Sequence, residues 1–182
     1  MGEIPPRRVV ARTLALLAAA VMGLAAVGCG GSAPDRAPGV AVVDAVIDGD
    51  TIDVRLAGGV ERVRLLGIDT PEIAHPDSPG ECFGDEARRL TETLVPRGST
   101  VRLERDIVGR DDYGRILAYV HVHVSDAEPG SGDDVFVNAH LVAEGYATPL
   151  FIGPNVARRP AIVDAARRAQ RARLGLWSAC AN

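Results

Sequence analysis

Two motifs that lie close together in the chain, residues 48–51 (DGDT) and 64–72 (RLLGIDTPE), restrict the folds open to it because both fall at the ends of predicted strands. Asp-Gly between two alternating segments is a tight-turn signal, so Asp50 is expected where two strands meet. Pro71 cannot donate to a strand ladder and therefore ends the next strand. The end of that strand then carries three oxygen-bearing residues, Asp69, Thr70 and Glu72. Carboxylate oxygens that converge at one rim suit Ca²⁺ or Mg²⁺.

The remaining periodicity predicts a small α+β domain with an antiparallel meander. Alternating apolar residues predict strands at 41–47, 51–56, 60–68, 100–105 and 115–124. Helical spacing predicts helices at 84–95, 136–144 and 160–174. A chain of 182 residues with 47% hydrophobic residues is long enough for one buried core. Residues 40–182 are expected to form this domain, and Trp177 is expected to close the base of its core.

The N-terminal residues read as an export signal rather than as part of the fold. Arginines precede an apolar run rich in Ala and Leu, which is the anatomy of a signal peptide over residues 1–28. Small residues directly before Cys29 resemble a bacterial lipobox, in which this cysteine is acylated. The sequence therefore predicts an exported protein, either a membrane lipoprotein that faces outward or a secreted protein cleaved nearby. Arg7-Arg8 also leaves twin-arginine export open. Residues 29–39, rich in Gly, Ser and Pro, are expected to be a flexible linker.

The cysteine count agrees with export. If Cys29 carries lipid, Cys82 and Cys180 remain as an even pair in an oxidising compartment. A disulfide between them would tie the segment after the second motif to the C-terminal end of the chain. Two free thiols are the alternative.

The charge of the chain argues against easy binding of a polyanion. Every basic residue is arginine, and the formal charge is −4. Residues 1–28 hold three arginines and one glutamate, so that the charge without them is −6. An acidic protein has no long-range attraction to nucleic acid. Local arginines together with a divalent cation could reverse the sign at the site itself.

A third motif, Asp111 to Arg115 (DDYGR), completes a resemblance that covers roughly residues 40–178. The ordered motifs D-G-D-T, R-L-L-x-x-D-T-P-E and D-x-Y-G-R resemble those of the staphylococcal nuclease (thermonuclease-like) family. The resemblance implies a mainly β fold, a five-stranded OB-type barrel with about three packed helices. Periodicity alone does not give a barrel.

The resemblance also implies a reaction and a set of roles. It implies an enzyme, a Ca²⁺-dependent endonuclease that hydrolyses phosphodiester bonds of DNA and RNA, with single-stranded or denatured chains favoured, and leaves 3′-phosphates. The family pattern makes Arg64, Glu72 and Arg115 catalytic. It assigns Ca²⁺ binding to Asp50, Asp69 and Thr70, and contact with the substrate phosphate to Tyr113. A monomer is expected.

Departures from the family pattern leave other functions open. In the family, lysines occupy the loop after D-T-P-E and the position before Y-G-R, where this chain has Asp77, Glu81 and Asp112. Weaker and more salt-dependent substrate binding is expected as a result. One alternative is a nucleic-acid-binding OB-type module without catalysis. Another is an envelope lipoprotein that binds a protein partner through its acidic loops.

Overall fold

A computed structural model describes residues 39–123 and 134–180, all of which belong to the unit Ala33–Asn182. The predicted signal, the linker up to residue 38 and all but the last residue of an acidic loop expected at 126–134 lie outside the described residues; Asp134 itself begins a strand. Strand β1 begins at Gly39, a residue that the sequence analysis assigned to the linker. None of the described helices has the length and apolar content that a membrane span requires.

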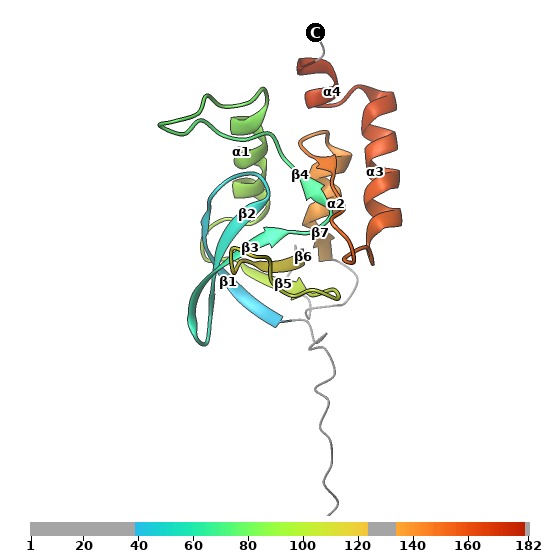
Figure 1. Ribbon diagram of the computed structural model, residues 1–182. Coiled ribbons are helices and arrows are strands. Elements are labelled where there is room, and N and C mark those ends of the chain that lie inside the picture. The colour runs from blue at the N-terminus through green and yellow to red at the C-terminus, as the bar shows by residue number, and fades with distance from the viewer. Residues whose placement is uncertain (1–38, 124–133, 181–182) are drawn as a thin grey trace, which may run out of the picture. The chain divides into compact units, whose positions relative to one another are not determined.

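Five strands close into a barrel, which confirms the fold predicted from the family resemblance (Figure 1). The barrel consists of β1 (Gly39–Val46), β2 (Thr51–Leu56), β3 (Gly59–Leu65), β5 (Thr100–Glu104) and β6 (Ile116–His123). Each strand is antiparallel to its neighbour in the order β3-β2-β1-β5-β6, and β3 then pairs in parallel with β6 to close the sheet. Closure matters for function because it brings the motif that follows β3 beside the motif that precedes β6.

The helices lie outside the barrel (Figure 1). They are α1 (Gly84–Leu94), α2 (Val137–Ala143), α3 (Arg159–Ala172) and the short α4 (Leu176–Ala179). In Figure 1 helix α1 stands above β1–β3, while α2, α3 and α4 form a second group beside it. Helix α3 buries Ile162, Ala165, Ala166 and Ala169 and exposes its arginines, as its 3.6-residue periodicity predicts.

One continuous apolar core fills the barrel and continues under α2 and α3. Alternate residues of the strands point inward, and the largest fully buried side chains are Tyr119, Ile52, Leu65, Ile68 and Ile116. The prediction that Trp177 closes the base of the core is wrong. Its side chain is only half-buried on α4 and does not belong to the core cluster, because α4 packs against the turn at Gly145 rather than against the barrel.

The main departure from the predicted elements positions the site. The strand predicted over residues 60–68 ends at Leu65, because Gly67 has φ +79° and turns the chain. A side chain at Gly67 would also lie 2.7 Å from Ile162. The chain resumes as β4 (Ile68–Asp69), which pairs with β8 (Thr148–Pro149) instead of with the barrel.

The predicted helix over residues 136–144 begins one residue later than expected. Strand β7 (Asp134–Phe136) precedes it, since Phe136 pairs with His121 of β6 and continues the sheet. Gly145 ends α2 with φ +78°, as its sequence position predicts.

Candidate active site

The turn between β1 and β2 presents Asp50 at the rim of the barrel. The backbone N–H groups of Ile47 and Asp48 donate to the Thr51 carbonyl oxygen, and the side chain of Asp48 accepts the Asp50 N–H at 3.0 Å. Gly49 is required here for space, because a methyl group on its Cα would lie 2.7 Å from Thr70 Oγ1. The turn therefore packs closely against Thr70 of the second motif.

Asp50 is a buried carboxylate with three polar partners. It accepts hydrogen bonds from the Thr70 N–H at 2.9 Å and the Thr51 hydroxyl at 3.1 Å, and it forms an ion pair with Arg64 at 3.0 Å. Burial raises the pKa of Asp50 to about 7, the charge of Asp48 adds to this effect, and Arg64 opposes it. Ionisation of this carboxyl group therefore requires more free energy than that of a solvated aspartate, and an additional cation nearby would lower that free energy.

Arg64 is held rigidly at the centre of the site. Strand register places it opposite Thr51, next to Asp50. Its guanidinium donates to the carbonyl oxygens of Leu65 and Ile68, both at 2.8 Å, and contacts Asp69 at 2.9 Å in addition to Asp50. Leu65 ends β3 and Ile68 begins β4, so the turn at Gly67 between them brings both carbonyl groups to Arg64. A guanidinium fixed by four groups has a defined orientation toward any ligand that reaches it.

Glu72 stands apart from the hydrogen-bonded cluster around Arg64. Its side chain is exposed, and within residues 39–123 and 134–180 no hydrogen bond or ion pair engages its carboxylate. Burial first, and then repulsion from Asp48, Asp69 and Glu81, raise the pKa of Glu72, while His75 acts in the opposite direction. A carboxylate that is unpaired and has a raised pKa is suited to accept a proton.

Arg115 belongs to a separate ion pair beside this cluster. Its Nε donates to Asp111 at 2.7 Å, and Asp111 also accepts the backbone N–H groups of Tyr113 and Arg115. Burial alone would raise the pKa of Asp111, but the hydrogen bonds from Arg115 outweigh it and leave the pKa below its ordinary value. The guanidinium lies 5.5 Å from the ring of Tyr113, which is 86% exposed.

Parallel pairing of β3 with β6 brings the two arginines to one cavity. Arg64 and Arg115 both line a cavity of about 380 Å³, together with Tyr113, Leu117, Leu150 and Ile152. A second, more open hollow of about 710 Å³ lies on the other side of Tyr113 and Arg115 and includes Asp48 and His75. Arg115 and Tyr113 therefore border both hollows, whereas Arg64 lines only the first.

The structure brings most of the predicted site residues together. Arg64, Asp50, Asp69 and Thr70 form one hydrogen-bonded cluster. Glu72 is coupled to that cluster by charge rather than by contact. Arg115 touches none of these acids and shares only the cavity with Arg64.

Three residues have roles that the sequence analysis did not assign. Asp111 was named only as the start of the third motif, but it caps the turn and orients Arg115. The spacing of an aspartate four residues before an arginine, across a Tyr-Gly turn, is the signal that could have revealed it. Asp48 shapes the Asp50 turn, and Glu81 hydrogen bonds to the backbone of Glu72.

A closed five-stranded barrel with two arginines and several carboxylates at one rim defines a protein of the OB-type barrel class. The sequence model of the family described as "Staphylococcal nuclease homologue" matches residues 62–179. The chain belongs to this family.

Curated relatives agree with this assignment. The chain is 40% identical to a thermonuclease of Staphylococcus intermedius over 75% of this chain and 74% of that protein. It is 38% identical to a thermonuclease of Staphylococcus hyicus over 73% and 72% of the two chains. It is also 35% identical to the endonuclease YncB of Bacillus subtilis over 75% of this chain and 60% of that protein.

Proposed function

We propose that this protein is an exported nuclease that hydrolyses phosphodiester bonds of DNA and RNA with the help of Ca²⁺. The family and the names of its thermonuclease and endonuclease relatives support nuclease activity. The observation that carries the proposal is the site itself. A fixed Arg64 and a second guanidinium, Arg115, share one cavity, and an exposed Glu72 lies near the carboxylates that fix Arg64.

Each residue has a defined role in this reaction. Attack of water on a phosphodiester places additional negative charge on the phosphate oxygens, and two planar guanidiniums stabilise that charge by bidentate hydrogen bonds. Glu72 takes the proton from the attacking water. Tyr113, which is largely exposed at the mouth of the cavity, contacts a phosphate oxygen. The family pattern implies 3′-phosphate products.

Arg115 can act in this way while it keeps its partner Asp111. Its Nε is bonded to Asp111, so the terminal nitrogens are the atoms that reach a phosphate while the pair with Asp111 fixes the plane of the guanidinium. Arg64 is similarly held by Asp50 and Asp69. Both arginines are thus oriented before the substrate arrives, which reduces the entropy lost on binding.

The donors in this cluster suit Ca²⁺. Asp50 and Asp69 carry hard carboxylate oxygens, Thr70 adds a backbone carbonyl group, and Asp48 and Glu72 add negative charge nearby. Burial raises the pKa of Asp50 by more than the Arg64 guanidinium lowers it, so a further cation at this carboxylate would favour its charged form. The described residues contain no group of three His, Cys, Asp or Glu side chains arranged around one point. Two carboxylates with a carbonyl group and water are therefore the proposed ligand set. Bound Ca²⁺ would supply positive charge to a phosphate oxygen.

Export and lipid attachment at Cys29 complete the proposal. The disulfide between Cys82 and Cys180, with Cα atoms 5.9 Å apart, supports an oxidising compartment. Extracellular Ca²⁺ modules bind at about 10⁻⁴–10⁻³ M, so a site with two carboxylates would be filled outside a cell and not inside. A monomer facing outward from the membrane would act on extracellular nucleic acid.

A chelator-controlled nuclease assay on the purified full-length chain tests the proposal. Release of acid-soluble nucleotides from denatured DNA and from RNA is measured with millimolar Ca²⁺ and with excess chelator. Wild type with Ca²⁺ should be active, and both chelation and Glu72→Gln should lower kcat by about 10²–10⁴-fold. The matched control is Glu92→Gln, which removes an exposed carboxylate on α1 that pairs with Arg88. Equal rates in all samples would contradict the proposal.

The self-paired arginines favour one second candidate, a nucleic-acid-binding module without catalysis. Because Arg64 and Arg115 already have carboxylate partners, they add little net positive charge to the surface. Protection of nucleic acid without turnover at millimolar Ca²⁺ would favour that candidate. Absence of both binding and turnover, with co-purification of a protein partner, would favour the envelope lipoprotein.

A further inference from the structure

The backbone of Glu72 is held by a short segment that lies nine residues further along the chain. The Glu72 N–H donates to a carboxylate oxygen of Glu81 at 3.0 Å, and the Glu81 N–H donates to the Glu72 carbonyl oxygen at 2.8 Å. These two hydrogen bonds run in opposite directions between the same pair of residues. They join the two ends of a loop, residues 73–80, most of which is exposed.

The rest of this segment is fastened just as closely. Gly84, the first residue of α1, packs against Glu72, because a methyl group on its Cα would lie 2.3 Å from the Glu72 carbonyl oxygen. The ring of Phe83 packs on Tyr146 with 4.8 Å between ring centroids. Phe83 has φ +75°, a left-handed conformation that a non-glycine residue keeps only where its surroundings enforce it. Residues 81–84 are called the clamp below.

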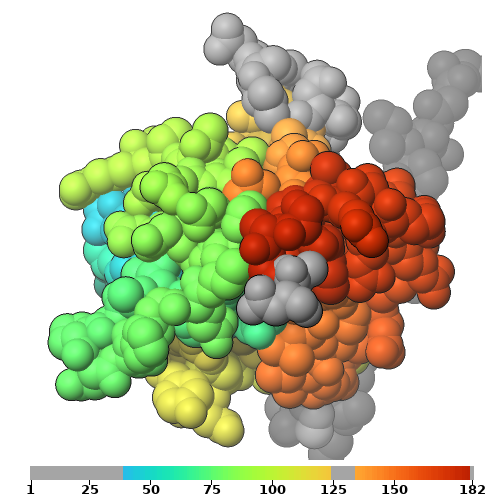
Figure 2. All heavy atoms as spheres, turned by 90° about the horizontal axis from the view of Figure 1, so that it is seen from above, coloured from blue at the N-terminus to red at the C-terminus, as the bar shows by residue number. Residues whose placement is uncertain are grey.

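The disulfide attaches the clamp to the C-terminal end of the fold. Cys82 is bonded to Cys180, which follows α4. Helix α4 is itself anchored, because the Leu176 N–H donates to the Gly145 carbonyl oxygen at 2.8 Å. Figure 2 shows the segment that precedes α1, in green, against the C-terminal residues, in red. The clamp is therefore attached to the C-terminal end of the fold as well as to Glu72.

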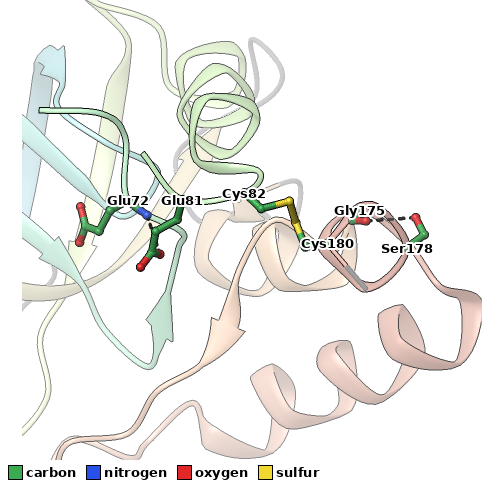
Figure 3. The surroundings of a disulfide bond; sticks show 6 residues. All are labelled: Glu72, Glu81, Cys82, Gly175, Ser178 and Cys180. Atoms are coloured by element: carbon green, nitrogen blue, oxygen red, sulfur yellow. Dashed lines mark hydrogen bonds between the residues drawn. A yellow bond between two sulfur atoms is a disulfide. The ribbon is translucent and has the colours of Figure 1, made fainter. Parts of the chain in front are cut away.

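The side chains of Glu72 and Cys82 point in different directions (Figure 3). Figure 3 shows the carboxylate of Glu72 pointing away from the disulfide, while the side chain of Cys82 points toward Cys180. Glu81 lies between them and reaches the backbone nitrogen of Glu72. The clamp thus holds the backbone of Glu72 and leaves its carboxylate free.

We infer that the clamp is a positioning device for Glu72, with Glu81 as the positioning residue and the Cys82–Cys180 disulfide as its anchor. The inference rests on the proposed function, in which Glu72 accepts the proton of the attacking water. Because Glu72 is exposed and no other described residue holds its carboxylate, its position depends on its backbone. An error of about 1 Å in the position of such a group can cost about 10²-fold in rate.

Two variants of Glu81 separate the hydrogen bond from the charge. Both Glu81→Gln and Glu81→Ala remove a negative charge near Glu72, but glutamine retains an oxygen that accepts the Glu72 N–H. We expect Glu81→Ala to lower kcat by about tenfold with KM changed less than about twofold, and Glu81→Gln to retain kcat within about twofold. Faster hydrogen exchange of the Glu72 amide is expected in Glu81→Ala only.

Removal of the anchor is tested in the full-length chain by the double substitution Cys82→Ser and Cys180→Ser. We expect kcat to fall about tenfold or more at a temperature well below the melting temperature, again with little change in KM. Val101→Ala is the stability control, since it creates a cavity in the barrel core at β5 and should lower the melting temperature without lowering kcat.

The outcomes distinguish this inference from the proposed function. An inactive wild type would refute the proposed function. An active wild type and an inactive Glu72→Gln, together with wild-type kcat in both Glu81→Ala and the double serine variant, would overturn the clamp alone. Equal losses in Glu81→Gln and Glu81→Ala would also overturn it, because the hydrogen bond would then have no role.

Discussion

The buried carboxylate of Asp50 should make the stability of the metal-free protein fall as the pH rises. Asp50 is 5% exposed, and its pKa is raised from 3.8 to about 7, chiefly by burial. Since the folded pKa lies above the unfolded one, the contribution to stability is fully present below about pH 4 and is lost as pH rises through about 7. At about 1.4 kcal/mol per pKa unit, the loss is on the order of 4 kcal/mol.

The variant Asp50→Asn isolates this effect. Asparagine has nearly the same shape and retains an oxygen that accepts the Thr70 N–H, but it does not ionise. The free energy of unfolding is measured by urea titration from about pH 4 to about pH 8 in the presence of chelator. The difference between wild type and variant cancels the other titrating groups. We expect it to shift in favour of the variant with rising pH, by up to about 1.4 kcal/mol per unit.

Addition of Ca²⁺ should reverse the shift. A ligand that binds only the folded state stabilises that state. Wild type should therefore gain stability at about pH 8, and Asp50→Asn should gain less. Asp112→Asn, an exposed aspartate on the turn before β6, is the control and should follow wild type. Parallel curves for wild type and Asp50→Asn across the whole range would refute the reasoning about burial.

Further predictions concern the disulfide, the Arg115 pair and the glycine beneath Asp50. Loss of the Cys82–Cys180 disulfide, which closes a separation of 98 residues, should cost roughly 4–5 kcal/mol and lower the melting temperature by roughly 10–15 °C, as measured by circular dichroism; a change too small to detect would contradict this. Asp111→Asn should lower kcat/KM about tenfold through Arg115 while changing stability by less than about 1 kcal/mol, and a nuclease rate equal to that of wild type would count against the assigned role. Gly49→Ala should destabilise the protein by about 1–3 kcal/mol because its methyl group would meet Thr70, whereas Gly58→Ala, with no atom within 4 Å, should not; equal stabilities in urea would show that the contact relaxes freely.

Much of the fold could be predicted from alternation alone. The segment 51–56 alternates cleanly and forms β2 with the predicted bounds. The segment 60–68 also alternates, but β3 stops at Leu65 because Gly67 turns the chain against Ile162. That contact joins residues far apart in the sequence, so no local pattern reports it.

The candidate site, like the fold, could be predicted only in part from the sequence. Asp50 and Asp69 fall at predicted strand ends, and the structure places both against Arg64. The partner of Arg115 was missed, because a pair of aspartates in a turn is usually solvated and only the folded turn shows Asp111 directed at the guanidinium. Glu81 was interpreted as a departure from the family pattern that weakens substrate binding, a prediction that stays untested. The structure gives it a second role, as the partner of the Glu72 backbone.

The sequence by itself determined the chemical types and their order along the chain: carboxylates at turns, arginines at strand ends and two cysteines in the domain. Local patterns suffice for this because turns, strand ends and residue chemistry depend on near neighbours. Tertiary structure decided which of these groups meet. The parallel closure of β3 on β6 brings Arg64 and Arg115 to one cavity, and the disulfide fastens the clamp behind Glu72. Such contacts depend on how distant segments pack, and packing is a property of the whole core.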